Sequence, residues 1–176
     1  MSISTPQPTG TKSTDKTRWR IDPARSQVEF RTPTFWGMTT VKGRFERYGG
    51  RLDLRDQPTI ELTIDAASLD TNNNRRDRHL RSGDFFDVEN HPEVRFVSDS
   101  ASLNGDRLVV AGRLYAAGNS MPLQFDAKLR GVDDELEVDA RTYADHLELG
   151  MSHGILGMIR GPSELIVRGR LVRDAE

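Results

Sequence analysis

The residues best suited to chemistry gather in one stretch of the chain, residues 68–92, which reads SLDTNNNRRDRHLRSGDFFDVENHP. Asp77 and His79 would supply a general acid and a general base there, with one of the arginines of the stretch as an anchor for an anion. Proton transfer of this kind depends on geometry, which sequence spacing does not provide. The sequence therefore favours a structural role, in which Asp77 caps the segment or pairs with an arginine and His79 hydrogen-bonds the loop into place.

Metal and cofactor chemistry finds little support elsewhere in the chain. The four histidines, His79, His91, His146 and His153, show no His-x-x-x-His spacing, so we expect no metal site, although one assembled from distant residues stays open. There is no cysteine, which excludes disulfides and thiolate chemistry. The sequence also lacks a Gly-rich phosphate loop, a Gly-x-Ser-x-Gly elbow and a dinucleotide fingerprint. We expect no cofactor and no enzymatic activity.

Most of the remaining chain alternates apolar and polar residues with the period of two that half-buried strands require. The runs cover residues 27–31, 41–46, 60–65, 93–97, 108–115, 123–129, 136–141 and 165–171. About eight or nine closely spaced strands without a long helix between them predict an all-β sandwich or barrel. Gly43, Gly112 and Gly169 inside these strands favour strongly bent strands or close backbone approach, and hence a barrel.

Some segments lack this alternation. Residues 1–17 are rich in Ser, Thr, Pro, Gly and Lys, so we expect a disordered arm before a single domain at residues 18–176. A short turn is expected over residues 33–38, and one or two helical turns over residues 73–82. Residues 68–92 are long and irregular but carry apolar side chains such as Phe85 and Phe86, so we expect an ordered excursion across one end of the barrel.

Composition and charge limit the classes of partner. The 176 residues carry a formal net charge of −2 with both signs interspersed, which argues against a nucleic-acid surface. No apolar stretch approaches the roughly 20 residues of a membrane-spanning helix. No signal peptide is visible in residues 1–18, so we expect a cytoplasmic protein, or a periplasmic one if a leader has been removed. The Gly- and Met-rich residues 150–161 are expected to form an adaptable apolar loop beside the barrel mouth.

A set of motifs resembles a known family over about residues 18–172. They are Trp19-x-Ile21-Asp22, Ser26-x-Val28-x-Phe30, Val41-x-Gly43-x-Phe45, Ile64–Thr71 (IDAASLDT), Arg76-Asp77-x-His79-Leu80 with Asp84–Val88, and Leu149-Gly150-Met151. With them the chain resembles the YceI-like domains. The resemblance implies an extended, lipocalin-like, eight-stranded antiparallel barrel that holds a polyisoprenoid or similar long-chain lipid, and a homodimer in some members. Arg25 stands where the family usually has His, and Leu149 where it usually has an aromatic residue.

We therefore expect a carrier or storage protein that binds a long-chain lipid of polyisoprenoid, isoprenoid quinone or fatty-acyl type. The expected ligand-binding residues are Val28, Phe30, Phe45, Ile64, Phe85, Phe96, Leu123, Phe125, Val138, Met151 and Val167. Arg76, Asp77, His79 and Phe86 are expected to form a structural motif loop. Alternation alone does not separate ligand-contacting residues from packed core residues. A stress-related interaction module with a filled barrel, and an enzyme acting on lipid precursors, stay open as alternatives.

Overall fold

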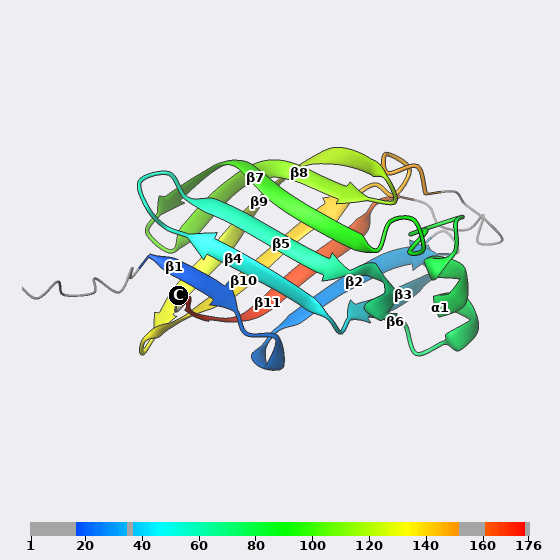
Figure 1. Cartoon of the computed structure of the whole chain (residues 1–176), viewed down its shortest axis with the longest axis horizontal. Helices are drawn as coiled ribbons and strands as arrows, with labels where there is room; N and C mark the ends of the chain where they lie inside the picture. Colours follow the sequence, from blue (N-terminus) through cyan, green and yellow to red (C-terminus); the bar gives the residue numbers. More distant parts are fainter. Residues whose placement is uncertain (1–16, 35–36, 152–160, 175–176) are drawn as a thin grey trace, which may run out of the picture.

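The alternating runs form antiparallel strands that close into a barrel (Figure 1). This computed structural model describes residues 17–34, 37–151 and 161–174. Its strands are β1 (Arg18–Ile21), β2 (Gln27–Thr34), β3 (Thr39–Phe45), β4 (Tyr48–Asp53), β5 (Thr59–Asp65), β6 (Leu69–Asp70), β7 (Glu93–Asn104), β8 (Arg107–Ala116), β9 (Asn119–Val132), β10 (Glu135–Ala144) and β11 (Ser163–Arg173). Helix α1 (Asn74–Arg81) and the 3₁₀ turns η1 (Pro23–Arg25) and η3 (Ala66–Ser68) lie between them.

Several of these segments are halves of interrupted strands. β1 and β2 flank η1, and both pair with β11, through Ile21↔Leu171 and Gln27↔Arg168. On their other side β1 pairs with β4, and β2 pairs with β3. Next along the sheet, β4 pairs with β5, and β3 pairs with β6. Each pair of segments thus acts as one broken strand, and the described chain closes as an eight-stranded antiparallel barrel. The predicted fold class is confirmed.

Close backbone approach explains why glycine stands inside the strands. A Cβ on Gly169 would lie 2.0 Å from the Ser26 hydroxyl oxygen, which also accepts a hydrogen bond of 3.1 Å from the Arg170 amide. This contact ties the break at η1 to β11. A Cβ on Gly112 would lie 2.2 Å from the Val97 carbonyl oxygen, opposite a bulge between Ser98 and Ser100. The interpretation of such glycines as signs of bending and close approach therefore holds at these positions.

The structure agrees with the predicted helix but only in part with the predicted turn. Helix α1 is confirmed, and the Asn73 side chain caps it by accepting a hydrogen bond of 3.0 Å from the Arg76 amide. The turn expected over residues 33–38 is wrong for its first two positions, which still belong to β2. That strand continues because Thr32 and Thr34 keep the inward alternation and are buried. Residues 1–16 lie outside the described part, whereas the Thr17 carbonyl accepts a hydrogen bond from the Leu54 amide.

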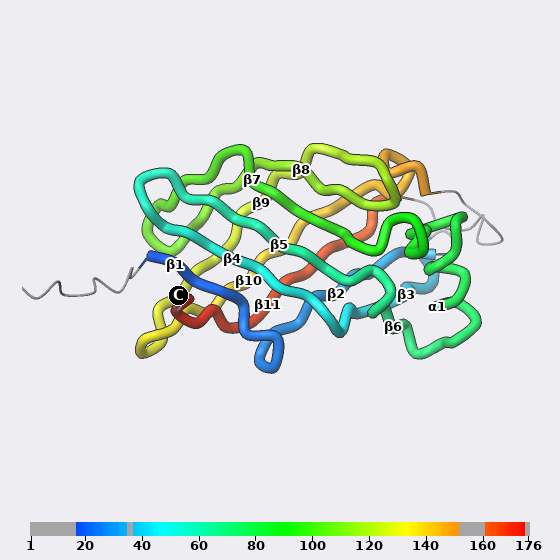
Figure 2. The backbone as a smooth tube through the Cα atoms, in the orientation of Figure 1, coloured from blue at the N-terminus to red at the C-terminus, as the bar shows by residue number. Residues whose placement is uncertain are grey.

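The two ends of the barrel differ (Figure 2). At the α1 end, α1 and residues 82–92 gather near the β8–β9 turn; at the opposite end lie β1 and the turns β4–β5, β7–β8 and β9–β10. Side chains near the opposite end, Trp19, Leu52, Leu108, Leu129 and Leu171, are all buried. The Arg173 guanidinium stacks 4.1 Å above the Trp19 ring there. None of the helices in the described ranges is long and apolar enough to cross a membrane.

Candidate functional site

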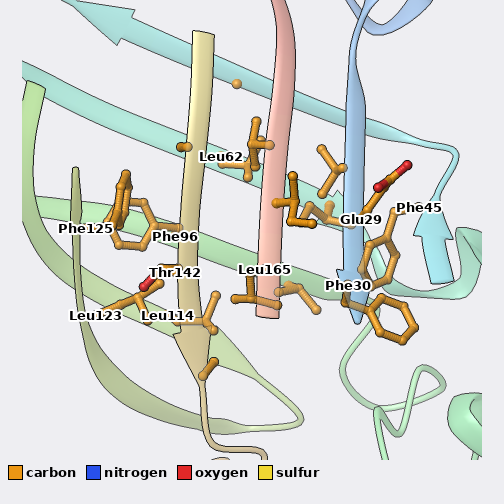
Figure 3. A pocket seen from close by; sticks show the side chains of 18 of the residues that line it. Glu29, Phe30, Phe45, Leu62, Phe96, Leu114, Leu123, Phe125, Thr142 and Leu165 are labelled. Carbon is orange, nitrogen blue, oxygen red and sulfur yellow. The ribbon is translucent and has the colours of Figure 1, made fainter. Parts of the chain in front are cut away.

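The barrel encloses a cavity of about 230 Å³. Inward-facing side chains from most of the strands line it, joined by residues of α1 and by Phe85 and Phe86. Figure 3 shows Phe30 and Phe45 on one side of this space and Phe96 and Phe125 on the other. The wall is almost entirely hydrocarbon, as expected for a site that takes an apolar ligand.

Incomplete burial of inward side chains marks the empty space. Val138, Ala140, Leu165 and Val167 sit at inward positions of β10 and β11, yet each is only partly buried. In a barrel filled by its own side chains we would expect these positions to be covered. The interior of this barrel is therefore incompletely filled.

The structure places every side chain predicted to contact ligand on the cavity wall: Val28, Phe30, Phe45, Ile64, Phe85, Phe96, Leu123, Phe125, Val138, Met151 and Val167. Contact with a ligand stays a prediction for each of them. Sequence reasoning missed other wall residues, including Leu62, Leu114 and Leu165. The same alternation that identified Ile64 and Val167 also places Leu62 and Leu165 inward, so that signal was present in the sequence.

An aromatic cluster lies at the α1 end. Tight turns bring it there: the Phe85 amide bonds the Ser82 carbonyl at 3.0 Å, and the Phe86 amide bonds the Leu80 carbonyl at 3.0 Å. The Phe86 ring meets Phe45 edge-on at 6.0 Å between centroids. Phe85 stacks on His146 at 6.0 Å. Residues 82–92 are thus an ordered excursion that packs onto the barrel, as expected from their apolar content.

The side chains of Arg76 and Asp77 both form hydrogen bonds with Thr71. Asp77 is 4% exposed, and its Oδ1 accepts hydrogen bonds from the Thr71 amide (3.0 Å) and hydroxyl (2.5 Å). Arg76 donates from Nε to the Thr71 hydroxyl oxygen (2.8 Å) and from Nη2 to the Thr71 carbonyl (2.7 Å). Asp77 thus holds the chain just before α1, whereas the cap of α1 is Asn73, and the partner of Asp77 is a threonine and not an arginine.

His79 holds the loop through its backbone. Its carbonyl accepts hydrogen bonds from the Ser82 amide (3.1 Å) and hydroxyl (2.6 Å). The ring Nε2 is buried and has no hydrogen-bond partner among the described residues, and the ring lies 6.4 Å from Phe85. The expectation that the imidazole itself hydrogen-bonds the loop is therefore wrong at Nε2. Within the described chain no hydrogen bond joins His79 to Asp77.

Metal ligands do not cluster in the part of the chain that the structure describes: no group of three or more His, Asp or Glu side chains is placed to hold an ion. His153, and most of the Gly- and Met-rich segment expected beside the mouth, lie outside the described residues. Met151, at the start of that segment, is buried in the cavity wall.

The two residues that depart from the family pattern, Leu149 and Arg25, lie in different parts of the structure. Leu149 is buried and forms part of the cavity wall. Arg25 lies on the outer turn η1, where it donates to both carboxylate oxygens of Glu135 at 2.8 and 2.9 Å and to Asp22 at 2.7 Å. These hydrogen bonds lower the pKa of Glu135 and of Asp22. Arg25 thus acts in an exposed ion-pair cluster outside the cavity.

The fold and the cavity define a class: an eight-stranded, lipocalin-like antiparallel barrel with an apolar interior space. The sequence pattern of the YceI-like domain matches residues 19–165. The chain belongs to the YceI-like family.

Relatives and solved structures agree with this assignment. A UPF0312 protein of Pseudomonas aeruginosa is 35% identical over 112 residues, 61% of this chain and 58% of that relative. Protein YceI of Escherichia coli is 33% identical over 103 residues, 56% and 54% of the two chains. The chain thus matches little more than half the length of these relatives.

Among solved structures, BcnA of Burkholderia cenocepacia superposes with a TM-score of 0.78 at 16% identity, covering 86% of this chain and 99% of BcnA. A polyisoprenoid binding domain from Saccharophagus degradans gives a TM-score of 0.72 at 11% identity, covering 90% and 99% of the two chains. At these identities the likeness establishes the fold.

Proposed function

We propose that this protein binds a long-chain apolar lipid in the barrel cavity and serves as its carrier or store. The observation that carries the proposal is the cavity of about 230 Å³ with hydrocarbon walls. An apolar cavity of about 150 Å³ already stays dry and takes up benzene. The likeness to a polyisoprenoid binding domain supports the same class of ligand. Polyisoprenoid, isoprenoid quinone and fatty-acyl chains all fit this description.

Chain length determines the affinity in this proposal. Each methylene moved from water into the cavity contributes about 0.8 kcal/mol. Association costs at least about 4 kcal/mol in lost translational and rotational freedom. A short alkyl chain therefore binds weakly, whereas a chain that places eight or more methylenes inside the barrel gains roughly 6 kcal/mol before those costs. Affinity is expected to increase with every carbon until the cavity is full.

Extraction of the purified protein with organic solvent, followed by mass spectrometry, tests the proposal. We expect a long-chain lipid in nearly equimolar amount. Protein treated with delipidating resin serves as the control, and it should regain the lipid on incubation with the extract. Recovery of no lipid, from cells shown to make polyisoprenoids, quinones and fatty acids, would contradict a carrier and favour an interaction module.

A further inference from the structure

The wall of the cavity changes in chemistry along the barrel. Toward the opposite end its buried side chains are aliphatic and include Leu108, Ala127, Leu129 and Leu171, while Arg51 and Glu61 on β4 and β5 also contribute to the lining. Inward hydroxyls occur on β2 and β11 near the α1 end, where those of Thr32 and Ser163 lie 2.7 Å apart. An amphiphile in this cavity gains most with its tail toward the opposite end and its head toward α1, because each part then lies against wall of its own polarity.

Arg76 is the cation that α1 contributes to the cavity wall. Thr71, which is 4% exposed, accepts hydrogen bonds from its Nε and Nη2, and buried Asp77 holds Thr71 in place from the other side. The guanidinium is therefore fixed by a chain of buried polar groups. Within the described residues no carboxylate lies within 4.0 Å of it, and its Nη1 donates no hydrogen bond.

Such a guanidinium is suited to an oxyanion. Arg76 is partly buried, and an incoming carboxylate or phosphate would add charge-assisted hydrogen bonds to its guanidinium. The planar fork of arginine matches both head groups. Arg78 on the same helix differs, because it is exposed and does not line the cavity.

From this arrangement we infer that Arg76 is the specificity-determining residue for the lipid head group. The ligand is a single-chain amphiphile with an oxyanion head, a carboxylate or a phosphate monoester, and is not a neutral lipid. This inference rests on the proposed function, and it narrows the ligand class within it.

Calorimetric titration of the delipidated protein with three 12-carbon ligands provides the test: dodecanoate, dodecyl phosphate and dodecanol. The wild type should bind at least one of the two anions about tenfold or more tightly than the alcohol, the size expected of a hydrogen bond to a charged group. Arg76→Gln should remove this preference, so that the variant binds neither anion more tightly than it binds dodecanol. Arg78→Gln, the matched control on α1, should keep the preference.

The outcomes separate the two proposals. Equal affinity of the wild type for dodecanol and both anions, or a preference that survives Arg76→Gln, would overturn the role of Arg76 while lipid binding stands. Binding of none of the three ligands would count against the cavity as a lipid site altogether. The comparison of the three ligands in the wild type needs no variant. Even if Arg76→Gln fails to fold, equal wild-type affinities for the alcohol and the anions would therefore refute the inference. Comparing dodecanoate with dodecyl phosphate identifies which head group the site prefers.

Discussion

Asp77 is a buried carboxylate whose hydrogen bonds keep the chain before α1 in place. Its Oδ1 receives both the amide and the hydroxyl of Thr71, so Asp77→Ala leaves two buried donors unpaired. We expect this variant to lose about 2–4 kcal/mol of unfolding free energy in urea titrations. Asp56→Ala, in the exposed turn between β4 and β5, is the matched control and should stay within about 0.5 kcal/mol of the wild type. An equal effect of the two substitutions would refute the structural role of Asp77.

Arg25 makes stability depend on pH. Its hydrogen bonds hold the pKa of Glu135 and of Asp22 below their ordinary values. A carboxylate whose pKa is lowered by folding stabilises the folded state above its ordinary pKa, and loses that contribution as the pH falls through the lowered value. Arg25→Gln should therefore be less stable than the wild type at pH 7, and the difference should shrink below about pH 4.

Thermal unfolding of both proteins between pH 3 and pH 7 measures this difference. Arg113→Gln provides the control, because Arg113 is exposed on β8 and forms no ion pair within the described chain. A difference between Arg25→Gln and wild type that is constant over this pH range would show that the carboxylates do not titrate against Arg25. The side chains are exposed, so the effect should also weaken with added salt.

At the scale of the elements, β7 and β8 show how the barrel bends. The register shifts between Ser98 and Ser100, and Gly112 on β8 faces that irregularity with Val97 and Phe96 closely packed around it. A methyl group at Gly112 would meet the Val97 carbonyl at 2.2 Å and the Phe96 ring at 2.7 Å. Both neighbours are constrained, because one is backbone and the other also packs on Phe125 at 5.3 Å.

Gly112→Ala should consequently lower the unfolding free energy by about 1–3 kcal/mol, the usual cost of overpacking. Gly131→Ala, near the end of β9, is the control, because a Cβ there has nothing within 4 Å. It should be neutral or slightly stabilising, since alanine restricts the unfolded chain. Chemical denaturation measures both variants, and a neutral Gly112→Ala would mean that β7 and β8 can separate freely at the bulge.

The whole molecule determines whether the cavity can be filled without loss of the fold. Ala140 lies midway along β10, in register with Val167 on β11 and Ala127 on β9, and it lines the cavity. Ala140→Phe places a ring in space that is otherwise empty. We expect the barrel to keep its fold, with a cost below about 3 kcal/mol, and to lose most of its lipid.

Lipid extracted per mole of protein measures this effect, and it should fall about tenfold, corresponding to at least two methylenes excluded. Val109→Phe is the control, because Val109 is exposed on the outer face of β8. If Ala140→Phe retained wild-type lipid content, the ligand would have to bind elsewhere. Such a result would also contradict the role of Arg76, because the lipid head group would then not bind in this cavity.

The local pattern of the sequence determined which side chains face inward. Alternation is a property of each strand by itself, since successive Cβ atoms point to opposite faces. For that reason residues as far apart as Val28, Phe96 and Val167 could be assigned to one wall before their neighbours were known. The cap of α1 is equally local, because Asn73 and Arg76 are three residues apart.

Only the tertiary structure decided the features that depend on several strands at once. An unfilled interior is the difference between the space that eight strands enclose and the volume of all their inward side chains, and no single run of residues contains that sum. The interruption at η1 and the placement of Arg76 at the cavity are of the same kind. The interruption at η1 depends on pairing with β11, and the place of Arg76 depends on the closed wall of the barrel. Both arise only when distant parts of the chain come together on folding.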